Sequence, residues 1–211
     1  MTGNAVSFPS QKVSGVILAG GQSRRLGTDK ALLELDGESL LSRAVRRLAA
    51  LSDDVIVVAN HPEKYEPLGL AARFVPDEEP GAGALMGIYS GLKAASHGAA
   101  FAVACDMPFF SVPLLQHMLP NISRYDVVIP CVDSMLEPLH AIYSKQCLPF
   151  MAALLAQGRR QIVSFLDKVE VFYVEAPTVA RFDPLHLAFL NVNTAEDWRL
   201  AQEMLARSEF G

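Results

Sequence analysis

The chain has 211 residues, 51% of them hydrophobic and 19% charged, a composition that excludes a disordered protein and allows one sizeable core. Its formal net charge of −5 excludes the broad basic surface of a nucleic-acid-binding protein, although a local cationic loop can still hold phosphate. No apolar run is long enough to span a membrane, and residues 1–12 lack the features of a secretory signal, so a flexible tail is expected there.

The three cysteines are odd in number and contain no C-x-x-C pair, so they do not indicate a disulfide framework. Cys105, Cys131 and Cys147 each lie in an apolar stretch, which favours free buried thiols. Thiols of this kind persist in a reducing compartment, so a cytoplasmic location is predicted. Neither nucleic acid nor a membrane is expected as a partner.

The first predicted strand, residues 13–19, runs directly into a glycine-rich loop with the sequence GGQSRRLGTDK. Gly20 and Gly21 allow backbone N–H groups to approach an anion without an intervening Cβ. Arg25 and Lys30 then supply positive charge, the first as a planar fork and the second as a mobile point charge. The loop therefore predicts a site for a polyphosphate.

Two widespread phosphate-binding loops do not fit this stretch. A Walker A loop places Lys directly after its last glycine, whereas here Thr28 follows Gly27. The dinucleotide fingerprint requires G-x-G-x-x-G directly after the strand, and this loop instead begins with two adjacent glycines. A glycine-rich turn with incidental surface charge is the plain alternative, and the length of the pattern argues against it.

The pattern that does fit is L-A-G-G-x-S-x-R-x-G-x-D-K, which resembles nucleotidyltransferases that use a nucleoside triphosphate and release pyrophosphate. It is most similar to the molybdenum cofactor guanylyltransferases, the MobA-like proteins, because related cytidylyl and sugar-nucleotide enzymes more often carry L-A-A-G. The resemblance implies catalytic roles for Arg25 and Lys30, which would stabilise the triphosphate and the departing pyrophosphate. It also implies GTP binding by residues of the strand end and loop, namely Leu18, Ala19, Gly20, Gly21 and Lys30.

Residues 39–50 are predicted to form an amphipathic helix after a turn signal at residues 36–37. The apolar side chains of this stretch recur at helical spacing and define one face. Three arginines, Arg43, Arg46 and Arg47, lie off that stripe and are expected on the solvated surface.

Two further strand ends carry polar side chains that suit a nucleotide. Residues 54–60 predict a central parallel strand ending in Asn60, and ligands of open α/β sheets lie beyond the carboxyl ends of strands. Turn chemistry explains Asn60 equally well, and the family resemblance favours nucleotide contact. Residues 72–76 predict another strand, and Asp77 after it matches an acidic residue with which the family binds the nucleotide.

A glycine-rich stretch then leads into a helix expected to end near residue 95. Gly81, Gly83 and Gly87 form a flexible entry that needs no ligand by itself. In the family, a similar P-G-x-G-P-L-x-G segment lies against the base and ribose. Ala84 stands where the family usually has Pro, so the detailed contacts of this segment stay open.

Asp106 follows the buried strand predicted at residues 100–104. A carboxylate that faces a phosphate loop from a central strand end is suited to Mg²⁺, which takes one or two protein carboxylates and completes its shell with phosphate oxygens and water. The alternative is a turn or helix cap, since a helix is predicted at residues 111–118. Together with Lys30, Asp106 is interpreted as a catalytic residue that binds both GTP and Mg²⁺.

The next part of the chain resembles the acceptor side of the family's active site. Residues 125–131 predict a strand, and E-P-L-H-A-I-Y at residues 137–143 resembles a family segment beside the acceptor, before a helix at residues 145–157. His140 is either a catalytic group or a packed histidine. Arg160 matches a family position that meets the acceptor's phosphate, with an ordinary surface arginine as the alternative.

Residues 170–175 and 185–190 predict the last two strands. The last motif that resembles the family is F-x-N-x-N-T at residues 189–194. The resemblance implies that Asn191 and Asn193 bind the acceptor by recognising its pterin. Asparagine amides suit a pterin edge because each offers a donor and an acceptor. The T-x-x-D motif at residues 194–197 predicts a capped start for a final helix.

Strands that alternate with helices predict one α/β domain over residues 13–211, a doubly wound and mostly parallel sheet with helices on both faces. No linker divides it. The resemblance covers nearly all of this range and implies transfer of GMP from GTP to the terminal phosphate of molybdopterin, with Mg²⁺ as cofactor. GTP and molybdopterin are the implied partners, with transient contacts to proteins of cofactor synthesis or molybdoenzyme maturation.

Two alternatives remain at this point. The first is a nucleotidyltransferase that uses CTP or another acceptor, either a pterin or a sugar phosphate, and Gly20 is the residue that argues against it. The second is a non-catalytic nucleotide-binding protein of the same fold, which the joint presence of Arg25, Lys30 and Asp106 disfavours.

Overall fold

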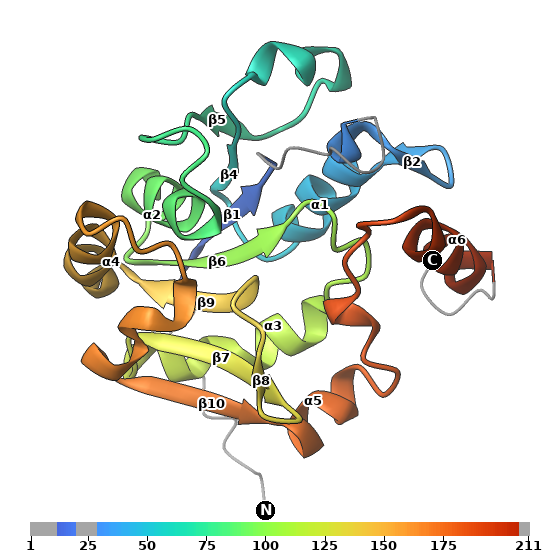
Figure 1. Cartoon of the computed structure of the whole chain (residues 1–211). Helices are drawn as coiled ribbons and strands as arrows, with labels where there is room; N and C mark the ends of the chain where they lie inside the picture. Colours follow the sequence, from blue (N-terminus) through green and yellow to red (C-terminus); the bar gives the residue numbers. More distant parts are fainter. Residues whose placement is uncertain (1–11, 20–28, 207–211) are drawn as a thin grey trace, which may run out of the picture.

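The computed structural model describes residues 12–19 and 29–206, and these form one eight-stranded sheet, a two-stranded sheet and helices (Figure 1). The strands are β1 (Ser14–Leu18), β2 (Glu34–Leu35), β3 (Glu38–Ser39), β4 (Val55–Val58), β5 (Arg73–Val75), β6 (Ala99–Ala104), β7 (Val127–Val132), β8 (Met135–Leu136), β9 (His140–Ser144) and β10 (Val171–Glu175). The α-helices are α1 (Leu40–Ala49), α2 (Ala84–Ala94), α3 (Val112–Met118), α4 (Leu148–Ala156), α5 (Ala176–Phe182) and α6 (Ala195–Ala206). Within these ranges no helix is long and apolar enough to cross a membrane.

Short 3₁₀ turns complete the described chain. They are η1 (Lys30–Leu32), η2 (Pro62–Lys64), η3 (Glu66–Leu68), η4 (Leu119–Ser123), η5 (Lys145–Cys147), η6 (Ile162–Lys168) and η7 (Leu187–Phe189). Most of the predicted tail lies outside the described residues. The predicted strands and helices agree with the structure to within a few residues, apart from the differences reported below.

The main sheet has the strand order β10-β7-β9-β6-β1-β4-β5, with β8 paired to β7. β1 pairs in parallel with β4 on one side and β6 on the other, and β4 continues in parallel to β5. β9 runs antiparallel between β6 and β7, while β10 is parallel to β7. The doubly wound, mostly parallel sheet is thus confirmed, with antiparallel strands confined to the β7–β9 part.

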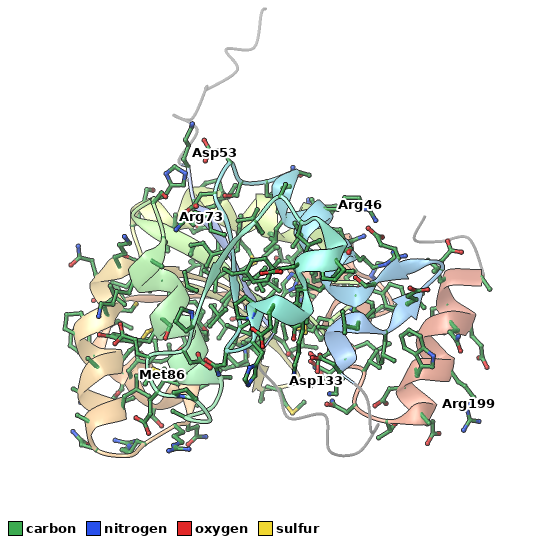
Figure 2. All side chains as sticks on the ribbon, turned by 90° about the horizontal axis from the view of Figure 1, so that it is seen from above. Arg46, Asp53, Arg73, Met86, Asp133 and Arg199 are labelled. Atoms are coloured by element: carbon green, nitrogen blue, oxygen red, sulfur yellow. The ribbon has the colours of Figure 1, made fainter. Side chains whose placement is uncertain are left out.

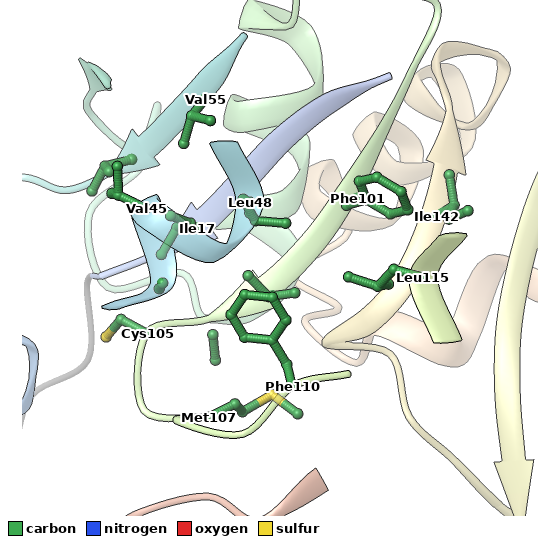
Figure 3. Close-up of a cluster of buried hydrophobic side chains, with 14 of the residues drawn as sticks. Ile17, Val45, Leu48, Val55, Phe101, Cys105, Met107, Phe110, Leu115 and Ile142 are labelled. Carbon is green, nitrogen blue, oxygen red and sulfur yellow. The ribbon is translucent and has the colours of Figure 1, made fainter. Parts of the chain in front are cut away.

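Alternating side chains of the central strands build a separate core on each face of the sheet. Ile17 and Phe101 point into a cluster covered by α1, α3 and α5, part of which Figure 3 shows around Leu48 and Phe110. Their neighbour Val16 points instead into a cluster covered by α2 and α4. Both faces are therefore buried, which explains the nearly continuous apolar runs of the parallel strands.

Gly91 allows α2 to lie very close to β1. A Cβ at this position would come within 2.3 Å of Val16 Cγ1 and 3.0 Å of Val58 Cγ2. Both neighbours are β-branched side chains of buried strands, so they cannot easily move aside. The glycine therefore sets the depth at which this helix packs on the sheet.

A third, smaller core joins the β2–β3 hairpin to the last helix. It contains Leu35, Leu40, Phe109, Leu187, Val192 and Ala201. Figure 1 shows α6 beside this hairpin, away from the other helices. The segment before α6, which carries two predicted acceptor residues, is thereby held between the small core and the main sheet.

The amino ends of the strands are closed by a network around Asp54. Its carboxylate accepts hydrogen bonds from Ser14 Oγ (2.6 Å), Arg73 Nη2 (2.7 Å) and the Ser96 amide (2.8 Å). Burial by itself would raise the pKa of Asp54, but these hydrogen bonds and the Arg73 charge lower it to about 2. In Figure 2, Arg73 lies at the end of the sheet opposite Met86, so this network is structural and far from the candidate site.

Two predictions about local structure are wrong. Arg43 is only 6% exposed and Arg47 donates to the Phe110 carbonyl at 2.7 Å, so neither lies on the solvated surface that was expected for them. Residues 185–190 form no strand but contain η7, because the buried Asp183 carboxylate accepts hydrogen bonds from two backbone amides of this segment. A local cap therefore outweighs the strand-like sequence there.

Candidate functional site

A cavity of about 580 Å³ lies at the carboxyl ends of β1, β4 and β6. The chain leaves β1 toward β4 on one side and later returns to β6 on the other, so the cavity lies where the strand order reverses, the usual ligand site of such sheets. Its lining includes the predicted site residues Leu18, Ala19, Lys30, Asp77, Asp106 and Asn191. The volume is in the range of small-molecule sites.

Lys30 and Asp106 meet in this cavity. Lys30 Nζ donates to Asp106 Oδ2 at 3.0 Å, and the two side chains are 17% and 19% exposed. The same ammonium group donates to Asn193 Oδ1 at 2.6 Å. Three residues predicted separately from distant parts of the sequence thus form one contiguous polar group.

The loop that carries Asp106 is fixed by backbone hydrogen bonds on both sides. The Cys105 amide donates to the Leu18 carbonyl at 3.0 Å, which continues the β1–β6 ladder to the cavity edge. The Val192 amide donates to the Asp106 carbonyl at 2.8 Å. The C-terminal segment is therefore tied directly to the loop that holds the candidate catalytic carboxylate.

Asn193 is positioned by the first turn of α6. Asp197 Oδ2 accepts from the amides of Asn193 (2.9 Å) and Thr194 (2.8 Å), while Thr194 Oγ1 accepts from the Asp197 amide at 3.1 Å. The predicted capping box is confirmed. The hydrogen bond from the Asn193 amide contributes most to lowering the pKa of Asp197, and the contacts with Thr194 add to it.

Asn60 and Asp77 form a reciprocal pair beside the cavity. The Asp77 amide donates to Asn60 Oδ1 at 3.0 Å, and Asn60 Nδ2 donates to Asp77 Oδ2 at 3.3 Å. Asp77 Oδ1 is buried without a hydrogen-bond partner in the described part of the chain. Burial raises the pKa of Asp77, and the hydrogen bond from Asn60 opposes that rise. One carboxylate oxygen of the pair is therefore buried beside Gly87 with no hydrogen-bond partner among the described residues.

Arg160 and Asn191 make contacts that the sequence did not indicate. Arg160 Nη1 donates to the Gly81 carbonyl at 2.8 Å, so this arginine lies beside the glycine-rich stretch of the cavity wall. Asn191 lines the cavity while its Nδ2 donates to the Phe189 carbonyl at 3.0 Å. The acceptor-binding roles of Arg160, Asn191 and Asn193 stay predictions.

His140 is fully buried, and neither ring nitrogen has a hydrogen-bond partner among residues 12–19 and 29–206. Burial first, and the charge of Arg47 second, lower its pKa to about 3. A neutral histidine held in the core in this way cannot relay a proton to the cavity. Of the two alternatives for this residue, the structure favours a packed side chain.

Asp106 is the carboxylate that contacts Lys30 in the cavity, and Asp29 and Asp77 also line it. Asp106 lines the cavity together with the amide-bearing Asn191, and the described residues contain no group of three His, Cys, Asp or Glu able to hold a metal without a ligand. A single carboxylate suits Mg²⁺ that arrives with a polyphosphate, because phosphate oxygens and water then complete the shell. Asp106 therefore fits the metal of a metal–nucleotide complex.

Some predicted residues cannot be placed, and others were missed. Gly20, Gly21 and Arg25 lie outside the described residues, so their roles stay predictions. No motif indicated that Tyr65 reaches this region, since its partners there are distant in the chain. The capping role of Asp29 was also missed. This residue directly precedes Lys30 and caps η1, and its position before a short turn was the sequence signal for that role.

Comparisons with known proteins agree with this geometry. Residues 15–170 match the family model of the MobA-like NTP transferase domain. The molybdenum cofactor guanylyltransferase of Desulfosudis oleivorans is 37% identical over 90% of this chain and 94% of its own, and that of Syntrophotalea carbinolica is 36% identical over 88% and 90%. The crystal structure of molybdopterin-guanine dinucleotide biosynthesis protein A from Archaeoglobus fulgidus superposes with a TM-score of 0.80, at 27% identity, over 92% of this chain and 100% of that one. The chain therefore belongs to the MobA-like NTP transferase family.

Proposed function

We propose that this protein is a molybdenum cofactor guanylyltransferase, which transfers GMP from GTP to the terminal phosphate of molybdopterin and releases pyrophosphate. The contact between Lys30 and Asp106 in the cavity at the strand-order reversal carries the proposal. It joins a cation for phosphate with a carboxylate for a metal at the place where such sheets bind nucleotides. The names of the relatives in Desulfosudis and Syntrophotalea support the same activity.

The proposed reaction is an in-line displacement at the α-phosphorus of GTP. A terminal phosphate oxygen of molybdopterin forms the new bond to this phosphorus, and the bond to the oxygen that leads to the β-phosphate breaks. The bonding electrons leave with pyrophosphate. Because the attacking phosphate is already anionic, no strong general base is required, which agrees with the burial of His140. Catalysis then rests on positioning and charge neutralisation.

Lys30 would neutralise the triphosphate and the departing pyrophosphate, assisted by Arg25. Asp106 would hold Mg²⁺ as it enters with GTP, and this ion, when bound, supplies a Lewis acid that withdraws charge from phosphate oxygens. In the protein alone, Lys30 instead pairs with Asp106 and Asn193. These partners keep the ammonium group in the cavity before the substrate arrives.

The guanine base is assigned to the wall formed by Leu18, Asp77 and the glycine-rich stretch before α2. Asp77 lines the cavity, and guanine offers donors at N1 and at its amino group, which a carboxylate accepts. Cytosine has an acceptor, N3, where guanine has the N1–H donor. A carboxylate accepts from N1–H but is repelled by the N3 lone pair, so Asp77 would favour GTP over CTP. Asn60 would hold the carboxylate in place through the pair described above.

The acceptor would lie on the side of Asn191 and Asn193, with Arg160 approaching it from the glycine-rich wall, where it donates to the Gly81 carbonyl. The free thiols Cys105, Cys131 and Cys147 support the further proposal that the protein works in the reducing cytoplasm. Contacts with proteins that make the cofactor or insert it into molybdoenzymes belong to the same proposal, since the product must be handed on.

The test is to incubate the protein with GTP, Mg²⁺ and molybdenum-loaded molybdopterin and to detect the guanine dinucleotide product by mass spectrometry. An Asp106→Asn variant is expected to lose at least about 100-fold in turnover, because a charge that acts on the reacting phosphates is removed. Asp167→Asn is the matched control, since Asp167 is exposed and pairs only with its neighbour Lys168 in the described contacts.

Three outcomes would contradict the proposal. Wild-type turnover in Asp106→Asn would exclude the role of the carboxylate. A cytosine product formed from CTP in preference to the guanine product would exclude GTP as the donor. Nucleotide binding without pyrophosphate release for any acceptor would point to the non-catalytic alternative.

A further inference from the structure

Tyr65, between η2 and η3, lies in the core but sends its hydroxyl to the edge of the cavity. The residue is 3% exposed, and its ring stacks on Phe74 with centroids 6.2 Å apart and an interplanar angle of 12°. The hydroxyl lies 3.3 Å from the Ala19 carbonyl and 3.0 Å from Asp29 Oδ2. One side chain thus contacts a described residue at each end of the glycine-rich loop motif, Ala19 and Asp29.

The hydroxyl has one proton, which can serve one of these acceptors at a time. The carboxylate is both closer and charged, so it is the preferred acceptor. Burial first, and the charge of Asp29 second, raise the pKa of Tyr65 far above the working range, so the hydroxyl keeps its proton. Tyr65 therefore acts as a permanent donor to Asp29.

Asp29 connects the Tyr65 hydroxyl to the turn that carries Lys30. Its Oδ1 accepts from the Ala31 amide at 3.2 Å and its carbonyl accepts from the Leu32 amide at 3.1 Å, so it caps η1 at the residue before Lys30. One carboxylate oxygen is thus held by Tyr65, with the Lys64 ammonium group farther away at 4.0 Å, while the other holds the turn. The side-chain conformation of Asp29 links the buried phenol to the orientation of the turn.

We infer that Tyr65 is a positioning residue that fixes the Lys30 turn through Asp29. The inference rests on the proposed function and adds a residue outside the phosphate-loop motif, supplied by the segment between β4 and β5. Without the hydroxyl, Asp29 keeps the cap but loses the donor that orients its carboxylate. The Lys30 ammonium group is then less well placed for phosphate, and small misplacements of such groups are costly to rate.

The first test compares Tyr65→Phe with Ser14→Ala. Ser14 is also buried and its hydroxyl donates to Asp54 Oδ2 at 2.6 Å at the amino ends of the strands, so both variants remove one buried hydroxyl that donates to a carboxylate. Each should lower the melting temperature by a similar small amount. Only Tyr65→Phe should lower kcat/KM for GTP, by about tenfold, with the KM for molybdopterin unchanged. Equal kinetic losses in both variants, or none in Tyr65→Phe, would overturn the inference.

The second test is a double-mutant cycle with Asp29→Asn. If Tyr65 acts through the Asp29 carboxylate, Tyr65→Phe should cost less than about twofold in the Asp29→Asn background, whereas independent action would give the product of the two single losses. The losses of Ser14→Ala and Asp29→Asn should be multiplicative, and this pair serves as the control. Multiplicative losses for the Tyr65 pair would overturn the inference.

A binding measurement separates this inference from the proposed function. Titration calorimetry with magnesium pyrophosphate reports on the Lys30 turn without turnover, and Tyr65→Phe should bind it about tenfold more weakly than wild type. A wild-type protein that binds pyrophosphate but transfers no GMP would exclude the proposed function alone. Equal affinity in wild type and Tyr65→Phe, or no binding by wild type, would exclude the positioning role.

Discussion

At the scale of single residues, His140 shows how strongly burial can lower the pKa of a histidine. It faces Val103 across the β6–β9 pairing and packs against Phe110 and Phe189. Its pKa of about 3 keeps the imidazole neutral in the folded protein, whereas the unfolded chain binds a proton near pH 6.5. The folded state is therefore disfavoured once the pH falls below that value.

We expect stability to decrease as the pH falls from 6.5 toward 3, because over this range only the unfolded state takes up the His140 proton. By pH 4.5 the loss from this residue should reach about 2.5 kcal/mol. Urea unfolding at pH 7.0 and 4.5 measures it, and His140→Met should lose less stability than wild type over the same interval. His61→Asn, which changes a 66% exposed side chain, is the control and should behave as wild type. Equal losses in His140→Met and wild type would contradict the argument.

At the scale of elements, α6 contributes to the site through its first turn and not through a side chain in the cavity. Asp197 binds the Asn193 amide, and Asn193 Oδ1 accepts from Lys30. The helix start thus fixes a hydrogen-bond partner of Lys30 from the C-terminal end of the described chain.

Replacing Asp197 by Ala should therefore reduce activity as well as stability. We expect a loss of about 1 kcal/mol from the cap and a fall of about fivefold in kcat/KM for GTP. Thr194→Ala removes the reciprocal hydrogen bond, in which Thr194 Oγ1 accepts from the Asp197 amide, but leaves Asn193 anchored. It should lose similar stability in urea unfolding and keep nearly all its activity. Parallel kinetic losses in the two variants would argue against a positioning role for Asp197.

The elements predicted correctly are those determined by local sequence. The capping box depends on residues three apart, and the buried strands on continuous apolar runs, so both are readable from the sequence. Arg47 was misassigned because its carbonyl partner at Phe110 lies 63 residues away. Tyr65 was missed for the same reason, since Asp29 lies 36 residues before it. Long-range partners of side chains have no signature in spacing.

At the scale of the whole molecule, the meeting of Lys30 and Asp106 could be predicted because both follow parallel strands whose carboxyl ends share one edge. The antiparallel position of β9 between β6 and β7 could not be predicted, because a short buried apolar run does not indicate the direction in which its strand will pair. The side of the cavity lined by Leu139, directly before β9, is accordingly the less predictable part.

The three cores should differ in how readily they open. α2 buries seven residues between Leu85 and Leu92, whereas α6 buries only Ala201. Segments with few buried contacts open at a lower free energy, so native-state hydrogen exchange should release the amides of α6 well before those of α2 and β1. Mass spectrometry of peptides from the exchanged protein measures this. Release of α2 and α6 at the same rate would show that the small core and the main cores unfold together.

The hydrogen bond from the Val192 amide to the Asp106 carbonyl bears on when the enzyme becomes competent during translation. A nascent chain released from the ribosome as far as β10 already contains every strand of the main sheet, together with Lys30 and Asp106. It still lacks Asn191, Asn193 and the segment that braces the Asp106 loop. The site would thus be complete only after the last part of the chain has been synthesised. Incomplete chains would contain Lys30 and Asp106 but not Asn191 and Asn193.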